Sequence, residues 1–289
     1  MFGRRPDGRA DKKIDPIVRA TSMFMPQRCD AQVMVKEELL YEPISNYIKK
    51  KRAEGVKISL MNVIVSAFVK TVCEYPELNR FIMNKQIYQR NEICVSYAML
   101  KNTEDNTISE TTVKLFFDEN DDIFSVAEKM NNAITENRKP EAENFTDKLA
   151  KFFLSIPLLP SLAIGLVRLL DRYGLLPKVI LDASPFHTSM FITNMASIKM
   201  PYVYHHIYNF GTTSVFFSMG QHESKVCLEK DGSVSKRVYI PLGIVIDERI
   251  CSGAEYARAV KLLFKYMSNP ELLEKKTDSL SSKKELSLL

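Results

Sequence analysis

The sequence PLGIVIDERICSGA, at residues 241–254, carries most of the information about the fold of this chain. It continues an apolar strand pattern from residue 234 and then meets three charged residues in succession, Asp247, Glu248 and Arg249. The apolar stripe over 254–267 predicts a helix, which Pro270 ends. The stretch therefore predicts a buried strand over 234–246, a short charged connection and a helix.

Strands and helices are mixed without regular alternation in the rest of the chain. Hairpins are predicted at 230–233, between strands 224–229 and 234–246, and at Asn84-Lys85 inside 82–88. Further strands are expected at 32–38, 93–100, 112–117, 188–195 and 212–219. Helices are expected from Pro43 to Lys51, from the Ser59 cap to near Pro76, and over 123–139. This mixture predicts an α+β fold, not a Rossmann array.

The chain has 289 residues, of which 45% are hydrophobic and 26% are charged, as in a globular protein with a sizeable core. The net charge is +5, and the excess lies within residues 1–28 and 274–289. The neutral remainder argues against binding to nucleic acid. We expect a basic N-terminal arm at 1–29, one domain at 30–273 and a disordered tail at 274–289.

Several kinds of site lack their sequence signatures. The five cysteines are scattered, without C-x-x-C spacing, which argues against a disulfide framework and against a zinc–thiolate site. No secretory signal is visible, so the cytoplasm is the default expectation. P-loop, G-x-G-x-x-G, G-x-S-x-G and H-E-x-x-H patterns are missing from the sequence. We therefore expect neither a metal nor a permanently bound cofactor.

The segment 148–181 is rich in apolar residues. Residues 152–167 carry no charge, but Pro157 and Pro160 interrupt them, and the run is shorter than the roughly 20 residues of a membrane span. We expect an apolar helical insertion that either packs against the protein or forms a lid over a channel for a hydrophobic ligand. The same segment could make a peripheral contact with a membrane.

Landmarks along the chain resemble those of one known family, in the same order. Residues 241–254, with Asn-Pro-Glu-Leu-Leu at 269–273, are similar to the Asp-His-Arg-x-x-Asp-Gly-Ala region of 2-oxo acid dehydrogenase dihydrolipoyl acyltransferases. The segments 57–59, 75–79 and 91–96 resemble that family, and 191–195 resembles its Thr-Ile-Ser-Asn-Leu-Gly. Chloramphenicol acetyltransferase belongs to the same superfamily. The resemblance covers roughly residues 30–273 and implies a two-layer α+β fold, a mixed sheet with packed helices.

The resemblance also implies an active site that is altered in two places. Glu248 stands where the family has its catalytic His, and Ser252 stands where the family has an Asp that supports the site through a salt bridge. Thr193 keeps the hydroxyl that donates a hydrogen bond to the oxyanion from a neighbouring subunit. Asn194, Asn209 and Ser252 are expected to contact substrate.

Two roles are open for Glu248. It can act as the general base if an apolar channel desolvates it and places it near the acceptor. Alternatively, it is an ion-pair partner of a nearby arginine such as Arg249 or Arg28, since a carboxylate at the end of a strand is usually structural. We weigh these two roles equally.

The histidines offer a second source of a base. His187 precedes Thr193 by about 20 Å of extended chain, so the two are not expected to share a site within one subunit. His205 and His206 should point to opposite sides of an extended segment, which argues against a paired metal site. We expect each of these to be a hydrogen-bonded interface histidine, with a base supplied from an adjacent subunit as the alternative.

The resemblance implies a homotrimer that transfers an acyl group from coenzyme A to a hydroxyl or thiol. The first thirty residues are too few for a lipoyl domain, so we expect acyl-CoA to be used directly as co-substrate. The alternative is a catalytically degenerate trimeric scaffold or binding protein of the same fold. A weaker third hypothesis is a membrane-surface protein that uses residues 148–181.

Overall fold

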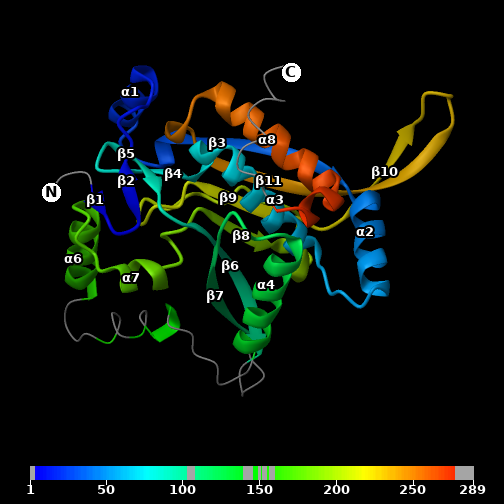
Figure 1. Ribbon diagram of the computed structural model, residues 1–289, viewed down its shortest axis with the longest axis horizontal. Coiled ribbons are helices and arrows are strands. Elements are labelled where there is room, and N and C mark those ends of the chain that lie inside the picture. Colours follow the sequence, from blue (N-terminus) through cyan, green and yellow to red (C-terminus); the bar gives the residue numbers. More distant parts are fainter. Residues whose placement is uncertain are drawn as a thin grey trace.

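The structure of the protein is a computed structural model, which describes residues 4–102, 108–138, 146–148, 151, 155 and 160–276. Its main feature is a seven-stranded mixed sheet in the order β10-β11-β9-β8-β6-β7, with β3 also paired to β11 (Figure 1). The strands are β3 (Gln32–Leu40), β6 (Ile93–Asn102), β7 (Ile108–Phe117), β8 (Met190–Asn194), β9 (Val215–Met219), β10 (Glu223–Leu228) and β11 (Val234–Asp247). All pairings are antiparallel except those of β8 with β6 and β9.

Four helices cover one face of this sheet and enclose the main hydrophobic core (Figure 1). They are α2 (Tyr41–Ala53), α3 (Leu60–Glu74), α4 (Ile123–Asn137) and α8 (Gly253–Ser268). Helix α3 contacts both α4 and α8, and residues 62–69 are buried throughout. The expected Ser59 cap is confirmed, because its hydroxyl accepts the N–H of Asn62 in a capping box. This arrangement confirms the predicted α+β class and the packing of helices on a mixed sheet.

The predicted elements are found with small shifts in their bounds. The Asn84-Lys85 hairpin is confirmed, since both residues have positive φ angles, 51° and 60°. Strand β9 begins at Val215 and not at residue 212, because the N–H groups of Thr212 and Thr213 donate to the carbonyl oxygen of Phe186. These two residues therefore hydrogen-bond to the loop at Phe186, and pairing within the sheet starts after them.

The residues predicted as an N-terminal arm are folded onto the rest of the chain. Strands β1 (Arg4–Arg5) and β2 (Gly8–Ala10) join β5 (Gln86–Arg90) and β4 (Arg80–Met83) in a second sheet of order β1-β2-β5-β4. Helix α1 (Pro16–Phe24) follows, and a small apolar cluster unites Ile14, Val18, Ile82 and Ile87. The pairing was missed because β1 and β2 have only two and three residues, too few for a periodic pattern.

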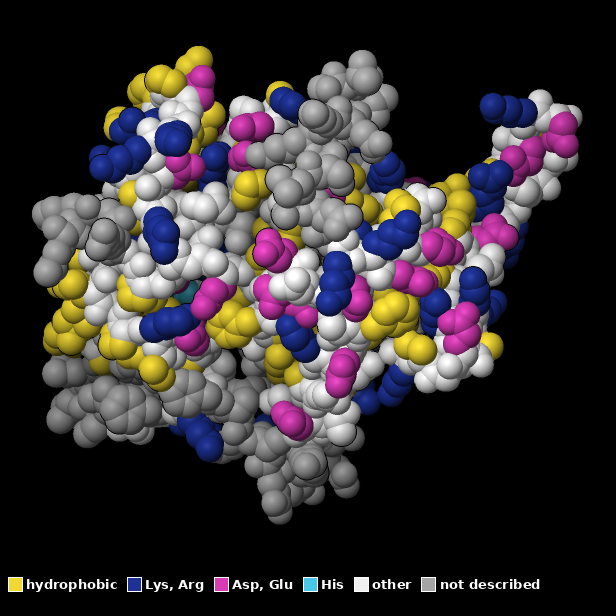
Figure 2. Space-filling model, in the orientation of Figure 1, with side chains coloured by type: hydrophobic (Ala, Val, Ile, Leu, Met, Phe, Trp, Pro, Cys, Tyr) yellow, Lys and Arg dark blue, Asp and Glu magenta, His cyan; other side chains and the backbone are white. Residues whose placement is uncertain are grey.

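The apolar insertion is partly described. Helices α6 (Pro160–Arg172) and α7 (Lys178–Ala183) lie in it, while 149–150, 152–154 and 156–159 fall outside the described residues, as does 277–289 of the expected tail. Leu162, Leu166 and Leu169 of α6 are between 52% and 62% exposed. Figure 2 shows apolar side chains over α6 and α1 on this face. No described helix combines the length and apolarity needed to cross a bilayer.

The opposite face of the main sheet is covered by an extended segment, residues 201–210. Phe191, Phe216 and Val245 of the sheet pack against Ile207 of that segment. Gly243 of β11 permits a close approach, because an added Cβ would lie 2.5 Å from the carbonyl oxygen of Val203. The segment can therefore lie directly on the backbone of β11.

This close approach predicts that substitution of Gly243 destabilises the protein and that substitution of Gly253 does not. Gly243→Ala should lower the free energy of unfolding by about 1–3 kcal/mol, because a methyl group is forced against backbone atoms. Gly253→Ala is the matched control, since an added Cβ there meets nothing within 4 Å. Urea denaturation measures both, and equal stability of the two variants would contradict the packing of 201–210 on β11.

Candidate functional site

A buried ion cluster lies where β11 ends. Asp247 is fully buried, and its two carboxylate oxygens accept from Nε and Nη2 of Arg249 at 2.7 and 2.6 Å. Nε of Arg28 lies 3.8 Å from Oδ2 of the same carboxylate. One carboxylate thus balances two buried guanidiniums. Burial lowers the pKa of Arg28 to about 10, helped by the charge of Arg249 and opposed by that of Asp247.

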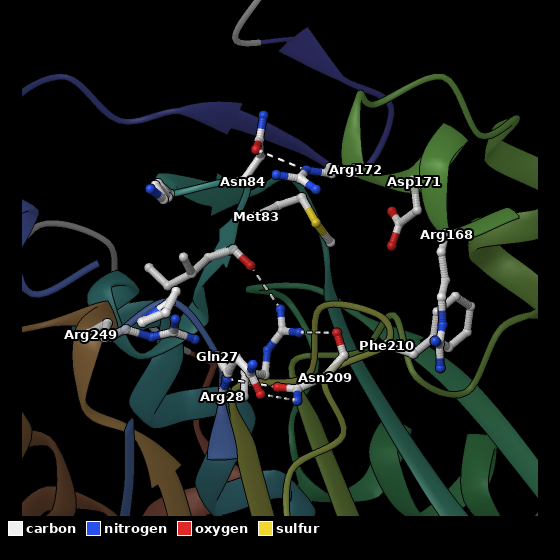
Figure 3. A pocket seen from close by; sticks show the side chains of 13 residues that line it. Gln27, Arg28, Met83, Asn84, Arg168, Asp171, Arg172, Asn209, Phe210 and Arg249 are labelled. Carbon is white, nitrogen blue, oxygen red and sulfur yellow. Dashed lines mark hydrogen bonds between the residues drawn. The ribbon is translucent and has the colours of Figure 1, made fainter. Parts of the chain in front are cut away.

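Arg28 also joins separate segments of the chain. Its Nη2 donates to the carbonyl oxygen of Ile82 at 2.8 Å, and its Nη1 donates to that of Asn209 at 3.2 Å (Figure 3). The amide oxygen of Asn209 accepts the backbone N–H of Arg28 at 2.8 Å. Asn209, predicted to contact substrate, therefore holds Arg28 in place and lines a cleft beside it.

Glu248 has a different environment from its two neighbours. It begins the short 3-10 helix Glu248–Ile250, and its side chain is exposed while Asp247 and Arg249 are buried. The predicted ion pair with Arg249 or Arg28 is wrong, because the carboxylate that both arginines contact is that of Asp247. Sequence reasoning overlooked Asp247, although the Asp-x-Arg spacing was available as a signal. The role of Glu248 as a base stays a prediction.

Ser252 has a structural task at the start of α8. Its hydroxyl accepts the N–H of Glu255 at 3.3 Å, and its own N–H donates to the Glu255 carboxylate at 2.8 Å. This capping box stabilises the helix that follows the charged connection. Ser252 therefore caps a helix and does not form the salt bridge that the resemblance implied for this position. The buried carboxylate nearby is that of Asp247.

Thr193 lies on the face of the main sheet opposite the four helices. Its neighbour Ile192 belongs to the main core and Phe191 to the cluster on the opposite face, so alternation places Thr193 with Phe191. Oγ1 of Thr193 is buried and has no hydrogen-bond partner among the described residues. The amide oxygen of Asn194 at the strand end is likewise buried without a partner there. A buried hydroxyl in this state has a free donor for a ligand oxygen.

His205 lies on the same face of the sheet as Thr193. Its ring stacks on Phe216 at 4.6 Å, and Phe216 stacks on Phe191 at 4.9 Å. Thr193 pairs in register with Ser218, which is two residues beyond Phe216 on β9. Because two residues of a strand span about 7 Å, Phe216, on which His205 stacks, lies about that far along the sheet from the Thr193 pair. Nε2 of His205 is buried without a partner among the described residues, and burial lowers the pKa of the ring from its usual value. An unprotonated ring nitrogen at this position can accept a proton.

The other two histidines have other surroundings. His206 is exposed and packs edge-on against Tyr208, which confirms that 205 and 206 point to opposite sides. His187 is buried, with Nδ1 2.7 Å from Ser184 Oγ and Nε2 3.1 Å from Asp171 Oδ2. His187 is thus a hydrogen-bonded histidine held inside its own chain.

Asp171 connects His187 to the N-terminal segment. Its carboxylate accepts from Nη2 of Arg5 at 2.6 Å. Burial by itself would raise the pKa of Asp171, but the contacts with His187 and Arg5 outweigh it and lower the pKa to about 2. The carboxylate is therefore charged and shared between two buried partners, which suits a structural role.

Solved structures with the same architecture cover most of the chain. The cubic core of the pyruvate dehydrogenase multienzyme complex matches with a TM-score of 0.57 at 12% identity, over 89% of this chain and 88% of that one. The two chains share the same fold. A probable dihydrolipoamide acetyltransferase from Listeria monocytogenes gives 0.54 at 13%, over 92% and 96%. Chloramphenicol acetyltransferase gives 0.52 at 12%, over 90% and 99%.

These matches confirm the predicted acyltransferase-like fold. At 12–13% identity they establish the fold alone. No protein-family model and no curated protein sequence matches the chain. On this fold, the chain carries an exposed Glu248 beside the buried Asp247 cluster.

The buried cluster predicts a large difference between two neighbouring carboxylates. Asp247→Asn should lower the free energy of unfolding by about 3–5 kcal/mol, because two buried guanidiniums lose their counter-charge. Glu248→Gln is the control, and since this side chain is exposed it should leave the unfolding midpoint unchanged. Thermal and urea denaturation report both, and equal stability of the Asp247 variant and the unmodified protein would contradict the cluster.

Proposed function

We propose that the protein is an acyltransferase that moves an acyl group from a coenzyme A thioester to a hydroxyl or thiol acceptor. The observation that carries the proposal is the buried hydroxyl of Thr193 near the end of β8, which has no hydrogen-bond partner among the described residues. The sequence resemblance assigns this position to the donor that stabilises the oxyanion. Support also comes from the fold, which is found in proteins named as acetyltransferases.

The reaction needs one proton acceptor and one oxyanion donor. A base takes the proton from the acceptor O–H or S–H, and the acceptor attacks the thioester carbonyl carbon. The carbonyl oxygen becomes an oxyanion, to which the Thr193 hydroxyl donates a hydrogen bond. When the C–S bond breaks, the coenzyme A sulfur leaves with the electron pair and receives the proton from the base. We also propose that the amide oxygen of Asn194, which has no partner among the described residues, accepts a hydrogen bond from the substrate.

The base is proposed to be Glu248, acting across an interface in a homotrimer. Within one chain Glu248 is exposed, so a neighbouring subunit has to cover it and exclude water before it can serve at the Thr193 site of that neighbour. His205 is the alternative base, because its neutral ring already shares a sheet face with Thr193. His187 is committed to Ser184 and Asp171 and has no role in this scheme.

The second candidate function is a scaffold or binding protein without turnover. The exposed carboxylate of Glu248 favours it, since a base in this fold requires a desolvated position. The role of Ser252 favours it too. The resembled family has an Asp at this position that supports the active site, whereas Ser252 caps the N-terminus of α8. Turnover with acyl-CoA separates the two candidates.

Removal of the Thr193 hydroxyl tests the oxyanion donor. Thr193→Ala should reduce kcat by about 10²–10³, because one oxyanion donor is lost. The rate is measured as release of coenzyme A from acyl-CoAs of graded chain length, with hydroxyl and thiol acceptors. Thr135→Ala is the matched control, since that hydroxyl only donates to the Asn131 carbonyl of its own helix. An unchanged rate for Thr193→Ala removes Thr193 from the mechanism.

Two further variants identify the base. Glu248→Gln should reduce kcat by about 10²–10⁴ while the unfolding midpoint stays unchanged, because the loss is one of basicity alone. His205→Gln is assayed in parallel, and Glu128→Gln on the exposed side of α4 is the control. A loss confined to the His205 variant transfers the base to that residue.

The trimer is tested separately. Sedimentation equilibrium should show a trimer, and a stable monomer at micromolar concentration contradicts the shared site. An unmodified protein without turnover on the whole panel supports the scaffold function.

A further inference from the structure

A cleft of about 550 Å³ opens beside Arg28. Its walls come from the segment 26–28, the β4–β5 hairpin, helix α6 and the loop at 209–210 (Figure 3). Neither Thr193, His205 nor Glu248 lines it. The cleft is therefore separate from the residues proposed for acyl transfer, and its volume is that of a site for a small molecule.

Positive charge dominates this cleft. Five of the lining residues are cationic, and the single acid among them is Asp171, which is engaged by Arg5 and His187. Arg28 and Arg249 share the one carboxylate of Asp247. The remaining three cations are Lys85, Arg168 and Arg172. All three are exposed, and none forms an ion pair within the described part of the chain. The lining thus carries a positive charge that its own side chains leave uncompensated.

The donors of the cleft are partly fixed in position. Nε of Arg172 donates to Asn84 Oδ1 at 3.1 Å across the cleft rim, which orients its guanidinium (Figure 3). Arg28 is 4% exposed, and its Nε has no hydrogen-bond acceptor among the described residues. Planar guanidinium groups match the oxygens of a phosphate and hold it by paired hydrogen bonds. Phe210 and Met83 add apolar lining beside these donors.

We propose that this cleft binds a phosphate-bearing small molecule through Arg168, Arg172 and Lys85, with Arg28 at its base. Phosphate is favoured over a carboxylate because several cations from different walls converge on one cleft, and a multiply charged group can engage them together. The proposal goes beyond acyl transfer and does not require it, since the proposed oxyanion donor and the candidate bases do not line the cleft.

Two sources could offer the phosphate. A soluble phosphate ester can enter the cleft, or a phospholipid can present its headgroup from a bilayer. The second source has support in the exposed Leu162, Leu166 and Leu169 of α6, the helix that also carries Arg168 and Arg172. The shared chemistry is the phosphate, and the experiment separates the sources.

The binding test uses inorganic pyrophosphate and the full chain. Isothermal titration calorimetry at low ionic strength should show saturable binding that weakens as salt is added. The double variant Arg168→Gln with Arg172→Gln should raise Kd by about tenfold or more. The matched control is Arg52→Gln with Arg258→Gln, which removes the same two charges from the exposed sides of α2 and α8 and should leave Kd unchanged.

Further variants and probes complete the test. Lys85→Gln, on the hairpin wall, should also weaken binding and does not depend on α6. Displacement of pyrophosphate by a soluble phosphate monoester that is not part of coenzyme A, such as glucose 6-phosphate, assigns a soluble ligand. Sedimentation with phosphatidylglycerol vesicles, but not with phosphatidylcholine vesicles, assigns a headgroup if the α6 double variant abolishes it. Absence of pyrophosphate binding, or equal weakening in the control variant, overturns the proposal and leaves the acyltransferase proposal untouched.

Discussion

The rest of this structure depends on a single buried carboxylate, that of Asp247. Two guanidiniums cannot stay charged in the interior without a counter-charge, so Arg28 and Arg249 have to lie beside it. Arg249 then reaches the carbonyl oxygen of Met25, and Arg28 reaches those of Ile82 and Asn209. One electrostatic requirement therefore fixes the N-terminal segment, the small sheet and the loop before β9 against the end of β11.

The packing on the other face of the main sheet, opposite the four helices, depends on a steric constraint. Gly243 lets the segment 201–210 lie on the backbone of β11, and this segment brings His205 onto Phe216. On the same face the hydroxyl of Thr193 is buried without a hydrogen-bond partner among the described residues. A polar group left in this state costs stability unless a ligand satisfies it, which is why the face is a better candidate for chemistry than the exposed Glu248 taken alone.

The distribution of charge along the sequence differs from its distribution on the folded protein. The sequence has a basic start and a neutral remainder, which argues against binding to nucleic acid. Folding brings Arg28, Lys85 and the α6 pair Arg168 and Arg172 together from three separate segments around one cleft. Their carboxylate neighbours Asp247 and Asp171 are buried behind them, so the field at the surface of the cleft is positive although the chain average is nearly balanced.

The sequence alone determined the features that depend on near neighbours. The Ser59 cap, the Asn84-Lys85 turn and the strand–helix order around residue 247 were predictable because their hydrogen bonds join residues a few positions apart. The pairing of the short strands β1 and β2 with β5 was not predictable, since two or three residues carry no periodic signal. The partner of Arg28 was also open, because Asp247 and Glu248 are adjacent carboxylates, and only packing decides which one is buried and which one faces solvent.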